Sequence, residues 1–234
     1  MDWRALDEML QGWSPPVGYR VEQLARVDIP EVTERLRAWY PDICVGTESR
    51  HLEAGFYERE FFLRGEDPAR SLVGLLCRPR DGHELVAMMT LERNARGRQI
   101  SSPMGAVEPS SRGIGLGHIG TVMLETVGRN IGAEVAYYFA TLKVARTQRN
   151  AERHGFTLVG IVPAFDQDAV APGTVRRVYE GLYAKVLADP ARIQLPAWEA
   201  MIPSTRALYR HLFGPHPDDP DQAATISVSS KVGT

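Results

Sequence analysis

Several features that identify common protein classes are missing from this sequence. It contains only two cysteines, Cys44 and Cys77, which stand in unrelated contexts without metal-ligand spacing. We therefore expect no disulfide framework and no metal site, and both thiols should be packing residues in a reducing compartment. The formal net charge is only −2, which provides no general attraction to nucleic acid or to an anionic membrane. Neither is expected as a partner.

Long hydrophobic runs are also missing. No stretch is apolar over a length that would span a bilayer, and the segment Met1–Glu8 lacks the apolar core of a signal peptide. The expected location is therefore the cytoplasm.

The length of 234 residues suits one large domain with extensions better than two full domains. Residues 1–18 are expected to form an N-terminal arm, because their helical spacing breaks at Ser14-Pro15-Pro16. Residues 19–187 form the main domain. Residues 188–213 carry apolar side chains at helical spacing and predict a helical extension, whereas residues 214–234 have the composition of a disordered tail.

The first half of the main domain alternates strand and helix signals. Tyr19–Leu24 alternates like a strand, Pro30 marks the start of a following helix, and His51–Arg64 predicts a second helix. The apolar runs Ser71–Cys77 and Glu84–Leu91 are joined by a turn that contains Asp-Gly, a strong hairpin signal. They should form an antiparallel pair.

The second half continues the pattern. Its predicted elements are a strand at Ile100–Val107 that Pro103 and Gly105 make irregular, a helix after a glycine-rich loop, a strand at Glu134–Leu142, a helix at Val144–His154, a strand at Phe156–Ile161, an exposed loop at Phe165–Thr174 and a strand at Val175–Leu187. The predicted fold class is α+β, with a mostly antiparallel twisted sheet flanked by helices.

The glycine-rich loop Arg112-Gly113-Ile114-Gly115-Leu116-Gly117 lies between an expected strand and an expected helix. Alternating glycines let backbone N–H groups converge, and the start of the helix adds free donors and the positive end of its dipole. Arg112 adds a charge-assisted contact. Such a site suits a diphosphate.

Two familiar phosphate-binding loops fit less well. A P-loop ends in Gly-Lys-Ser/Thr, which is absent here. The sequence Gly115-Leu116-Gly117-His118-Ile119-Gly120 matches the dinucleotide-binding motif. That motif, however, directly follows its strand and requires an acidic residue at the end of the next strand. Here Pro109-Ser110-Ser111 intervenes, and Glu134 stands at the start of its strand. A nicotinamide enzyme stays open as an alternative.

The segment Val107–Gly117 resembles the acetyl-CoA loop of the GNAT acyltransferase superfamily, Val-x-Pro-x-x-Arg-Gly-x-Gly-x-Gly. A second resemblance lies at Gly155-Phe156, where the family commonly ends a helix before a strand. The order of elements agrees from about Tyr19 to Leu187. The resemblance implies a GNAT-like fold, acetyl-CoA as co-substrate, a pyrophosphate held by Arg112, Gly113, Ile114, Gly115, Leu116 and Gly117, and main-chain contacts to the cofactor from Ala106 and Val107.

The sequence departs from the family pattern on the helix after the next strand. Many members carry an asparagine and a tyrosine there, and the tyrosine protonates the leaving thiolate. The corresponding positions hold Val144 and Ala151. The acid and base must then lie elsewhere, or the protein binds coenzyme A without turning it over.

Candidates for the missing groups come from the neighbourhood of the loop. Glu108 is the nearest acid, and Tyr138 lies on the next strand; we take these two as catalytic candidates, although a solvated carboxylate and a packed aromatic are the plain alternatives. Asp166 and Asp168, in the expected loop, are candidates for binding a cationic amine.

The leading hypothesis is an acyl-CoA-dependent N-acyltransferase that transfers acetyl from acetyl-CoA to a primary amine of a small molecule by direct attack. The alternative is a non-catalytic or regulatory coenzyme A-binding protein. Apolar residues after Leu187, among them Trp198 and Phe213, could support a homodimer. The acceptor is not readable, because variable loops build acceptor pockets.

Overall fold

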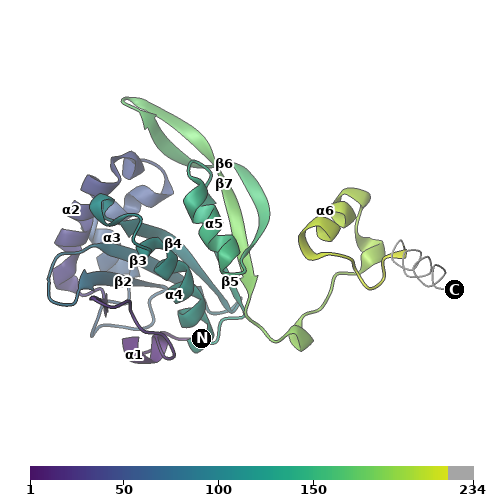
Figure 1. The fold of residues 1–234 in the computed structure, drawn as a ribbon, viewed down its shortest axis with the longest axis horizontal. Helices are drawn as coiled ribbons and strands as arrows, with labels where there is room; N and C mark the ends of the chain where they lie inside the picture. Colours follow the sequence, from purple (N-terminus) through teal and green to yellow (C-terminus); the bar gives the residue numbers. More distant parts are fainter. Residues whose placement is uncertain (221–234) are drawn as a thin grey trace. The chain divides into compact units, whose positions relative to one another are not determined.

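A seven-stranded sheet organises the first of two compact units, Met1–Ala188, in the computed structural model, which describes residues 1–220 (Figure 1). The strands are β1 (Tyr19–Gln23), β2 (Leu72–Pro79), β3 (Ala87–Asn94), β4 (Gln99–Val107), β5 (Val135–Thr141), β6 (Thr157–Ala171) and β7 (Thr174–Val186). Their order in the sheet is β1-β2-β3-β4-β5-β7-β6. Only β4 and β5 run parallel; every other neighbouring pair is antiparallel. The predicted mixed, mostly antiparallel α+β sheet is confirmed.

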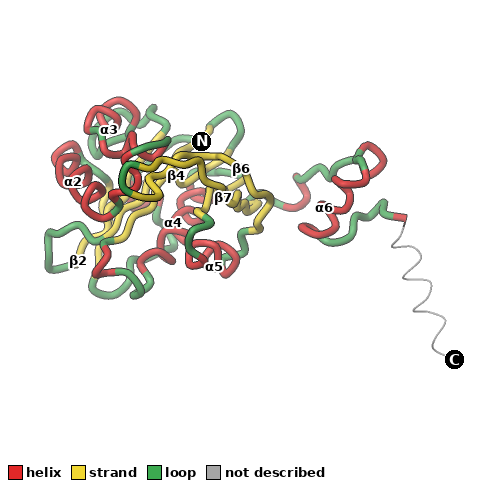
Figure 2. Tube along the Cα trace, turned by 90° about the horizontal axis from the view of Figure 1, so that it is seen from above, coloured by secondary structure: helices red, strands yellow, loops and turns green. Residues whose placement is uncertain are grey.

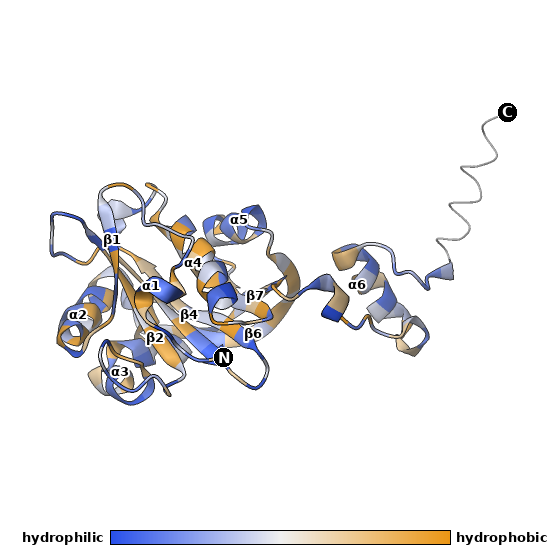
Figure 3. Ribbon diagram, turned by 90° about the horizontal axis from the view of Figure 1, so that it is seen from below, coloured by the Kyte–Doolittle hydropathy of each residue, from blue (hydrophilic) through white to orange (hydrophobic). Residues whose placement is uncertain are grey.

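Helices cover both faces of this sheet (Figure 2). The α-helices of the unit are α1 (Leu6–Met9), α2 (Ile29–Trp39), α3 (Ala54–Glu60), α4 (Leu116–Asn130) and α5 (Ala145–Arg153); the short 3₁₀ turns η2 (Pro41–Cys44) and η3 (Thr47–Leu52) follow α2. α2 and α3 pack on one face, and α1, α4 and α5 pack on the other. α5 is largely hydrophilic and buries only Ala151 (Figure 3).

The core follows from the strand sequences. β2 is buried along almost its whole length, because neighbours pair on both edges and helices cover both faces. Its side chains alternate between two clusters: Val73, Leu75 and Cys77 join the α4 side, whereas Leu72 and Leu76 join the α2/α3 side. It pairs antiparallel with β3 as predicted; the connection begins with a turn from Pro79 to Gly82, in which the Gly82 amide donates to the Pro79 carbonyl at 3.3 Å. The resulting sheet is a rigid support for the loops at its edges.

β4 and β5 diverge, and this split is the feature that creates a site. The two strands pair only from Gln99↔Val135 to Ser101↔Tyr137. Beyond Ser101 a register shift lets two β4 residues, Ser102 and Pro103, stand opposite one residue of β3. Such a bulge bends its strand away from the regular ladder, in agreement with the irregularity that Pro103 and Gly105 predicted.

Two expectations about local structure were wrong. Residues 165–171 do not form an exposed loop; they belong to β6, where Asp166, Gln167 and Asp168 pair with residues 176–178 of β7, and only Pro172 and Gly173 remain for the turn. Cross-strand pairing stabilises this polar stretch, which has no apolar alternation to reveal it. The single helix expected at His51–Arg64 is instead the end of η3 followed by the shorter α3, because Glu53 is extended between them.

The second unit begins at Asp189 and has its own small core. Its helix α6 (Pro203–Phe213) confirms the predicted C-terminal helix. The ring of Trp198 is 2% exposed and stacks on His216 at 5.2 Å, while Arg206 and Arg210 lie over its face. Most of the expected tail, from residue 221, lies outside the described residues.

Candidate functional site

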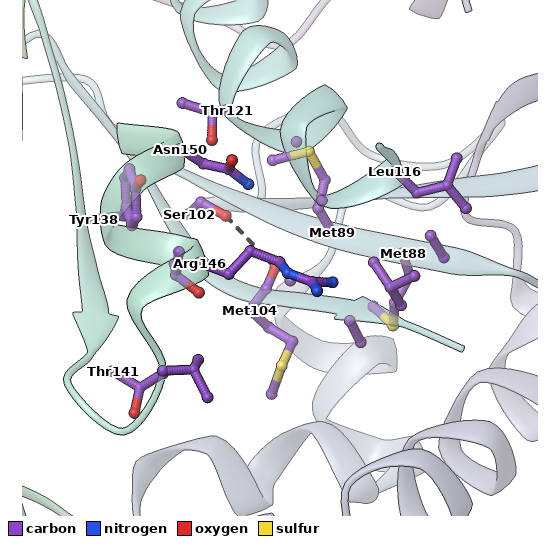
Figure 4. Close-up of a pocket in the computed structure, with 18 of the residues that line it drawn as sticks. Met88, Met89, Ser102, Met104, Leu116, Thr121, Tyr138, Thr141, Arg146 and Asn150 are labelled. Atoms are coloured by element: carbon purple, nitrogen blue, oxygen red, sulfur yellow. Dashed lines mark hydrogen bonds between the residues drawn. The ribbon is translucent and has the colours of Figure 1, made fainter. Parts of the chain in front are cut away.

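A cleft of about 880 Å³ opens where β4 and β5 part (Figure 4). Residues from both separated strands, from the glycine loop, from α4 and α5, from η2 and η3, and from β6 and β7 line it. Because the strands no longer pair beyond Ser101, residues from the α4/α5 side and from the α2/α3 side of the sheet line the same cleft.

The predicted phosphate loop stands at the mouth of this cleft. Gly113 and Gly115 have φ of +95° and +98°, conformations that favour glycine, and Gly115 is the N-cap of α4. The amides of the first helical turn have no partner inside the helix and point out of its start. Arg112, Gly113, Leu116 and Gly117 line the cleft. The geometry suits a bound diphosphate.

Arg112 is held in place by the end of α2. Its guanidinium lies 4.8 Å from the ring of Tyr40 and donates to the carbonyl of Trp39 (3.2 Å) and to that of Val107 (3.1 Å). Those contacts leave part of its donor fork free. Arg112 is thus a fixed positive charge beside the loop amides.

The predicted cofactor wall, Ala106 and Val107, lines the cleft with Gly105. The amide of Glu108 donates to the carbonyl oxygen of Val86 and therefore points toward β3. Main-chain groups alternate in direction along an antiparallel strand, so those of Val107 and Gly105 point away from β3, toward the gap between β4 and β5. The Tyr40 hydroxyl already engages Val107 at both its amide and its carbonyl. Gly105 is exposed, and a Cβ on it would meet nothing within 4 Å.

Tyr138 reaches the cleft from β5 on the α4/α5 side. The side chain is 8% exposed, and its hydroxyl has no partner with hydrogen-bond geometry among residues 1–220. Burial raises the pKa of this hydroxyl to about 12, an effect that the neighbouring Thr121 opposes. The group therefore stays protonated at neutral pH and has a proton to donate.

α5 contributes polar groups that differ from those of the GNAT pattern. Ala151 is fully buried, and Val144 is exposed at the start of the helix. Arg146 and Asn150 reach into the cleft instead (Figure 4). Asn150 lies against the start of α4, with its amide nitrogen 3.9 Å from a Cβ placed on Gly117. No sequence motif pointed to Asn150.

Four carboxylates gather at the cleft on the α2/α3 side and in the β6–β7 hairpin. Asp42, Glu48, Asp168 and Glu180, which we call the acidic pocket, line both the cleft and a small adjoining cavity. Lys143 contacts two of them, Asp168 directly and Asp42 at 3.3 Å. The cluster suits a cationic partner.

Burial raises the pKa of two carboxylates of this pocket. Burial raises the pKa of Glu48 to about 7, with help from Glu180 and Asp166. Burial and Asp166 likewise raise the pKa of Glu180 to about 7, and Lys143 opposes both shifts. Groups that titrate near neutral pH can accept a proton from an amine.

The two remaining predicted residues lie elsewhere. Glu108 is not among the residues that line the cleft, and its carboxylate accepts from the Ser111 hydroxyl (3.1 Å). Asp166 is 8% exposed, and its carboxylate accepts from the amides of Thr47 and Gln167 (2.8 Å each). Asp166 thereby fastens η3 to β6, next to Gly46, whose backbone passes too close to Asp166 for any side chain.

Sequence reasoning missed Glu48 and Glu180. They lie 132 positions apart, and they meet only because η3 packs on β6 while Glu180 pairs opposite Val162 and Thr141. Within residues 1–220, no group of three or more histidine, cysteine or acidic side chains has an arrangement that could hold a metal ion. No helix in that range combines the length and apolarity needed to cross a membrane.

The sheet, its split and the loop at the start of α4 define the class: the chain has the fold of the GNAT N-acetyltransferases. Arabidopsis thaliana NAA60, solved in complex with acetyl-CoA, matches with a TM-score of 0.55 and 13% identity over 72% of this chain and 98% of its own. A mutant of the spermidine N-acetyltransferase SpeG from Vibrio cholerae matches with a TM-score of 0.57 and 10% identity over 72% and 94%.

A third solved structure, the ribosomal-protein-S5-alanine acetyltransferase from Vibrio fischeri, matches with a TM-score of 0.57 and 9% identity over 75% of this chain and 97% of its own. The sequence matches no protein-family model, and a search of curated proteins gives no significant match. At these identities the likeness is one of fold.

Proposed function

We propose that this chain is an acyl-CoA-dependent N-acyltransferase that transfers an acetyl group from acetyl-CoA to a primary amine of a small molecule. The observation that carries the proposal is the combination of a glycine loop at the start of α4 with an acidic pocket across one cleft. The loop supplies donors for a diphosphate, and the pocket supplies acceptors for an ammonium group.

The cofactor belongs on the α4/α5 side. The amides of Gly113–Gly117 and the guanidinium of Arg112 would hold the pyrophosphate, and the main chain of Gly105 would face the pantetheine arm. When bound, the co-substrate supplies an activated acyl group. The chain's own task is to fix that group in the gap between β4 and β5 and to orient the amine toward it.

The acceptor belongs on the other side, in the acidic pocket. Glu180 takes the proton from the ammonium group, directly or through water, so that the neutral amine can form the N–C bond while the C–S bond breaks. Tyr138 then gives its proton to the departing thiolate, and the second proton that the nitrogen loses as the amide forms returns through water to the Tyr138 oxygen. Glu180 lies opposite Thr141, three positions and roughly 10 Å along the strands from Tyr138, so the two proton transfers use different faces of the gap.

The other predicted residues have supporting roles in this proposal. Asp168 would bind the ammonium group beside Lys143, whereas Asp166 would act by holding η3 against β6. Glu108 could act as a base only by leaving Ser111 and turning into the cleft. We therefore assign the base to Glu180 in preference to Glu108.

Calorimetric titration with acetyl-CoA tests the donor side, and thiol release across a panel of amines tests the reaction. We expect binding, and release with simple cationic amines in preference to amino acids, whose carboxylates the acidic pocket repels. Absence of acetyl-CoA binding by the folded protein would sink the proposal.

One alternative, coenzyme A binding without catalysis, is supported by a separate observation. Ala151 and Val144 replace the polar pair of the GNAT pattern, which favours a coenzyme A-binding protein without turnover. Binding of acetyl-CoA without thiol release for any amine would favour it. A nicotinamide enzyme is disfavoured, because the dinucleotide fold has a mostly parallel sheet and this sheet has one parallel pair.

A further inference from the structure

A buried chain of hydrogen bonds joins Met104, two residues before the cofactor wall, to the main chain of Glu48, whose side chain lies in the acidic pocket. The amide of Met104 donates to Thr90 Oγ1 at 3.1 Å. Thr90 Oγ1 lies 3.5 Å from His51 Nε2, and His51 Nδ1 lies 3.2 Å from the carbonyl oxygen of Glu48. The chain thus runs from β4 through β3 to η3.

The two ends fix the direction of every bond in this chain. A carbonyl oxygen only accepts, so His51 must carry its hydrogen on Nδ1 and offer Nε2 as an acceptor. The Thr90 hydroxyl then donates to Nε2, and its oxygen accepts from the Met104 amide. Thr90 and His51 each use one donor and one acceptor, and no other placement of their hydrogens satisfies all three bonds.

The surroundings leave these groups no other partners. His51 and Thr90 are both 0% exposed. The imidazole meets the rings of Phe56, Tyr57 and Phe61 at centroid distances of 5.1, 6.3 and 6.5 Å, and the Tyr57 hydroxyl donates to the His51 carbonyl at 2.8 Å. Burial and Arg50 lower the pKa of His51 to about 4, which keeps the ring neutral. Breaking one bond would strand a buried polar group.

Each end of the chain is next to one half of the cleft. Met104 comes directly after the β4 bulge, where the strand leaves β5, and precedes the cleft-facing Gly105. Glu48 carries its side chain in the acidic pocket, one residue after Thr47, which is tied to Asp166. Neither His51 nor Thr90 lines the cleft.

We propose that Thr90 and His51 are positioning residues for the acyl transfer, which hold the β4 bulge and the Glu48 turn in one fixed relative geometry. The inference rests on the proposed function, since it assigns the two halves of the cleft to donor and acceptor. Displacement of a reacting group by about 1 Å can slow an enzyme by roughly 100-fold. A chain of hydrogen bonds that fixes the distance between the bulge and the turn therefore protects the rate.

Thr90→Val removes the hydroxyl and keeps the shape, whereas Thr90→Ser keeps the hydroxyl. We expect Thr90→Val to lower kcat by about tenfold to 100-fold with the Kd of acetyl-CoA little changed, because the diphosphate loop is a separate element, and Thr90→Ser to restore most of the rate. Thr33→Val is the matched control: Thr33 is also buried and donates to a backbone carbonyl, that of Pro30 (3.0 Å), away from the cleft.

Equal rates for Thr90→Val, Thr33→Val and wild type would overturn the positioning role. The wild-type protein gives a test that needs neither a variant nor activity: heteronuclear NMR of the His51 ring should show the Nδ1–H tautomer at neutral pH, and an Nε2–H tautomer contradicts the chain of bonds. Should no amine support thiol release, the proposed function fails by itself. Amide exchange at Met104 then decides the inference: faster in Thr90→Val than in Thr90→Ser supports it, and equal exchange overturns it.

Discussion

The hydroxyl of Tyr40 occupies both main-chain groups of Val107: it accepts from the amide at 3.1 Å and donates to the carbonyl at 3.3 Å. An amide has one hydrogen, so Val107 can bind a cofactor through its N–H only if Tyr40 moves. Gly105 is the next residue whose main chain faces the gap. We therefore expect Gly105 to be the main-chain partner in the absence of a rearrangement at Tyr40.

Tyr40→Phe tests this relationship. The ring that stacks under Arg112 is kept, and only the hydroxyl is lost. We expect a loss of stability of about 1–3 kcal/mol, the net value of two hydrogen bonds, and an unchanged Kd for acetyl-CoA by calorimetry. Binding tightened by about tenfold, or 1.4 kcal/mol, would show instead that Tyr40 competes with the cofactor for Val107.

Gly105→Val should fill the cleft and leave the fold intact. A Cβ on Gly105 meets nothing within 4 Å, and valine favours strands, so the melting temperature should change little. The added side chain projects into the space assigned to the cofactor, so acetyl-CoA binding should be lost. Gly160→Val is the control, because Gly160 lies in β6 with equally open surroundings and does not line the cleft. Equal binding by both variants contradicts the assignment.

Gly115→Ala addresses the diphosphate loop. Gly115 has φ of +98°, where an L-residue is strained by roughly 1–2 kcal/mol. Reorientation of the loop amides should cost one charge-assisted hydrogen bond, about 1.5–3 kcal/mol, and so weaken acetyl-CoA binding by about tenfold to 100-fold. Gly18→Ala carries the same type of strain at φ +88° far from the loop. It should lower the melting temperature without changing the Kd.

The parts of the site that the sequence predicted are those built from neighbouring residues. The β2–β3 hairpin follows from two apolar runs separated by turn residues, the β4 irregularity follows from Pro103 and Gly105, and the loop follows from its spaced glycines. Each of these signals acts over a few residues, where backbone conformation alone decides the outcome.

The acceptor side depended on contacts that no local pattern records. Glu48 and Glu180 meet because the β6–β7 hairpin continues through a polar stretch and because Gly46 lets η3 approach β6. Glu108 is the converse case, because it is near the loop in sequence but does not line the cleft. Tertiary packing decides which carboxylates come together, and it leaves no pattern in the sequence around each of them.

Glu180→Gln tests the base and has a defined pH signature. Asp166, Lys143, Asp168, Glu48 and Asp42 surround Glu180, and its pKa is about 7. In wild type, kcat/KM should rise as the pH passes through about 7 and Glu180 loses its proton. Glu180→Gln should lower kcat/KM by about 100-fold or more. A rate that does not depend on Glu180 assigns the base elsewhere.

The same pKa makes a stability prediction for this variant. A carboxyl whose pKa is raised by folding binds more protons in the folded state, so its contribution to stability falls as the pH rises from 4.5 to about 7. Glutamine has no such cost. Glu180→Gln should therefore melt at a higher temperature than wild type at pH 8, with the difference smaller at pH 5. The opposite trend would mean that Glu180 is ionised and stabilised in the folded protein.

Lys143→Met changes the charge of the acidic pocket without touching its carboxylates. Lys143 contacts Asp168 and Asp42, and it lowers the pKa of both Glu48 and Glu180. Its removal leaves the pocket more negative, so the KM of a cationic amine should fall and the pH midpoint of kcat/KM should move upward. Both changes should weaken as salt is added, because these charges are partly exposed.

Lys185→Met separates this effect from the general loss of an ion pair. Lys185 pairs with Glu125 at 2.6 Å and does not line the cleft, so its replacement should cost stability and leave the pH midpoint in place. If Lys143→Met instead raises the KM of cationic amines and leaves the midpoint unchanged, Lys143 holds the carboxylates in position for the substrate.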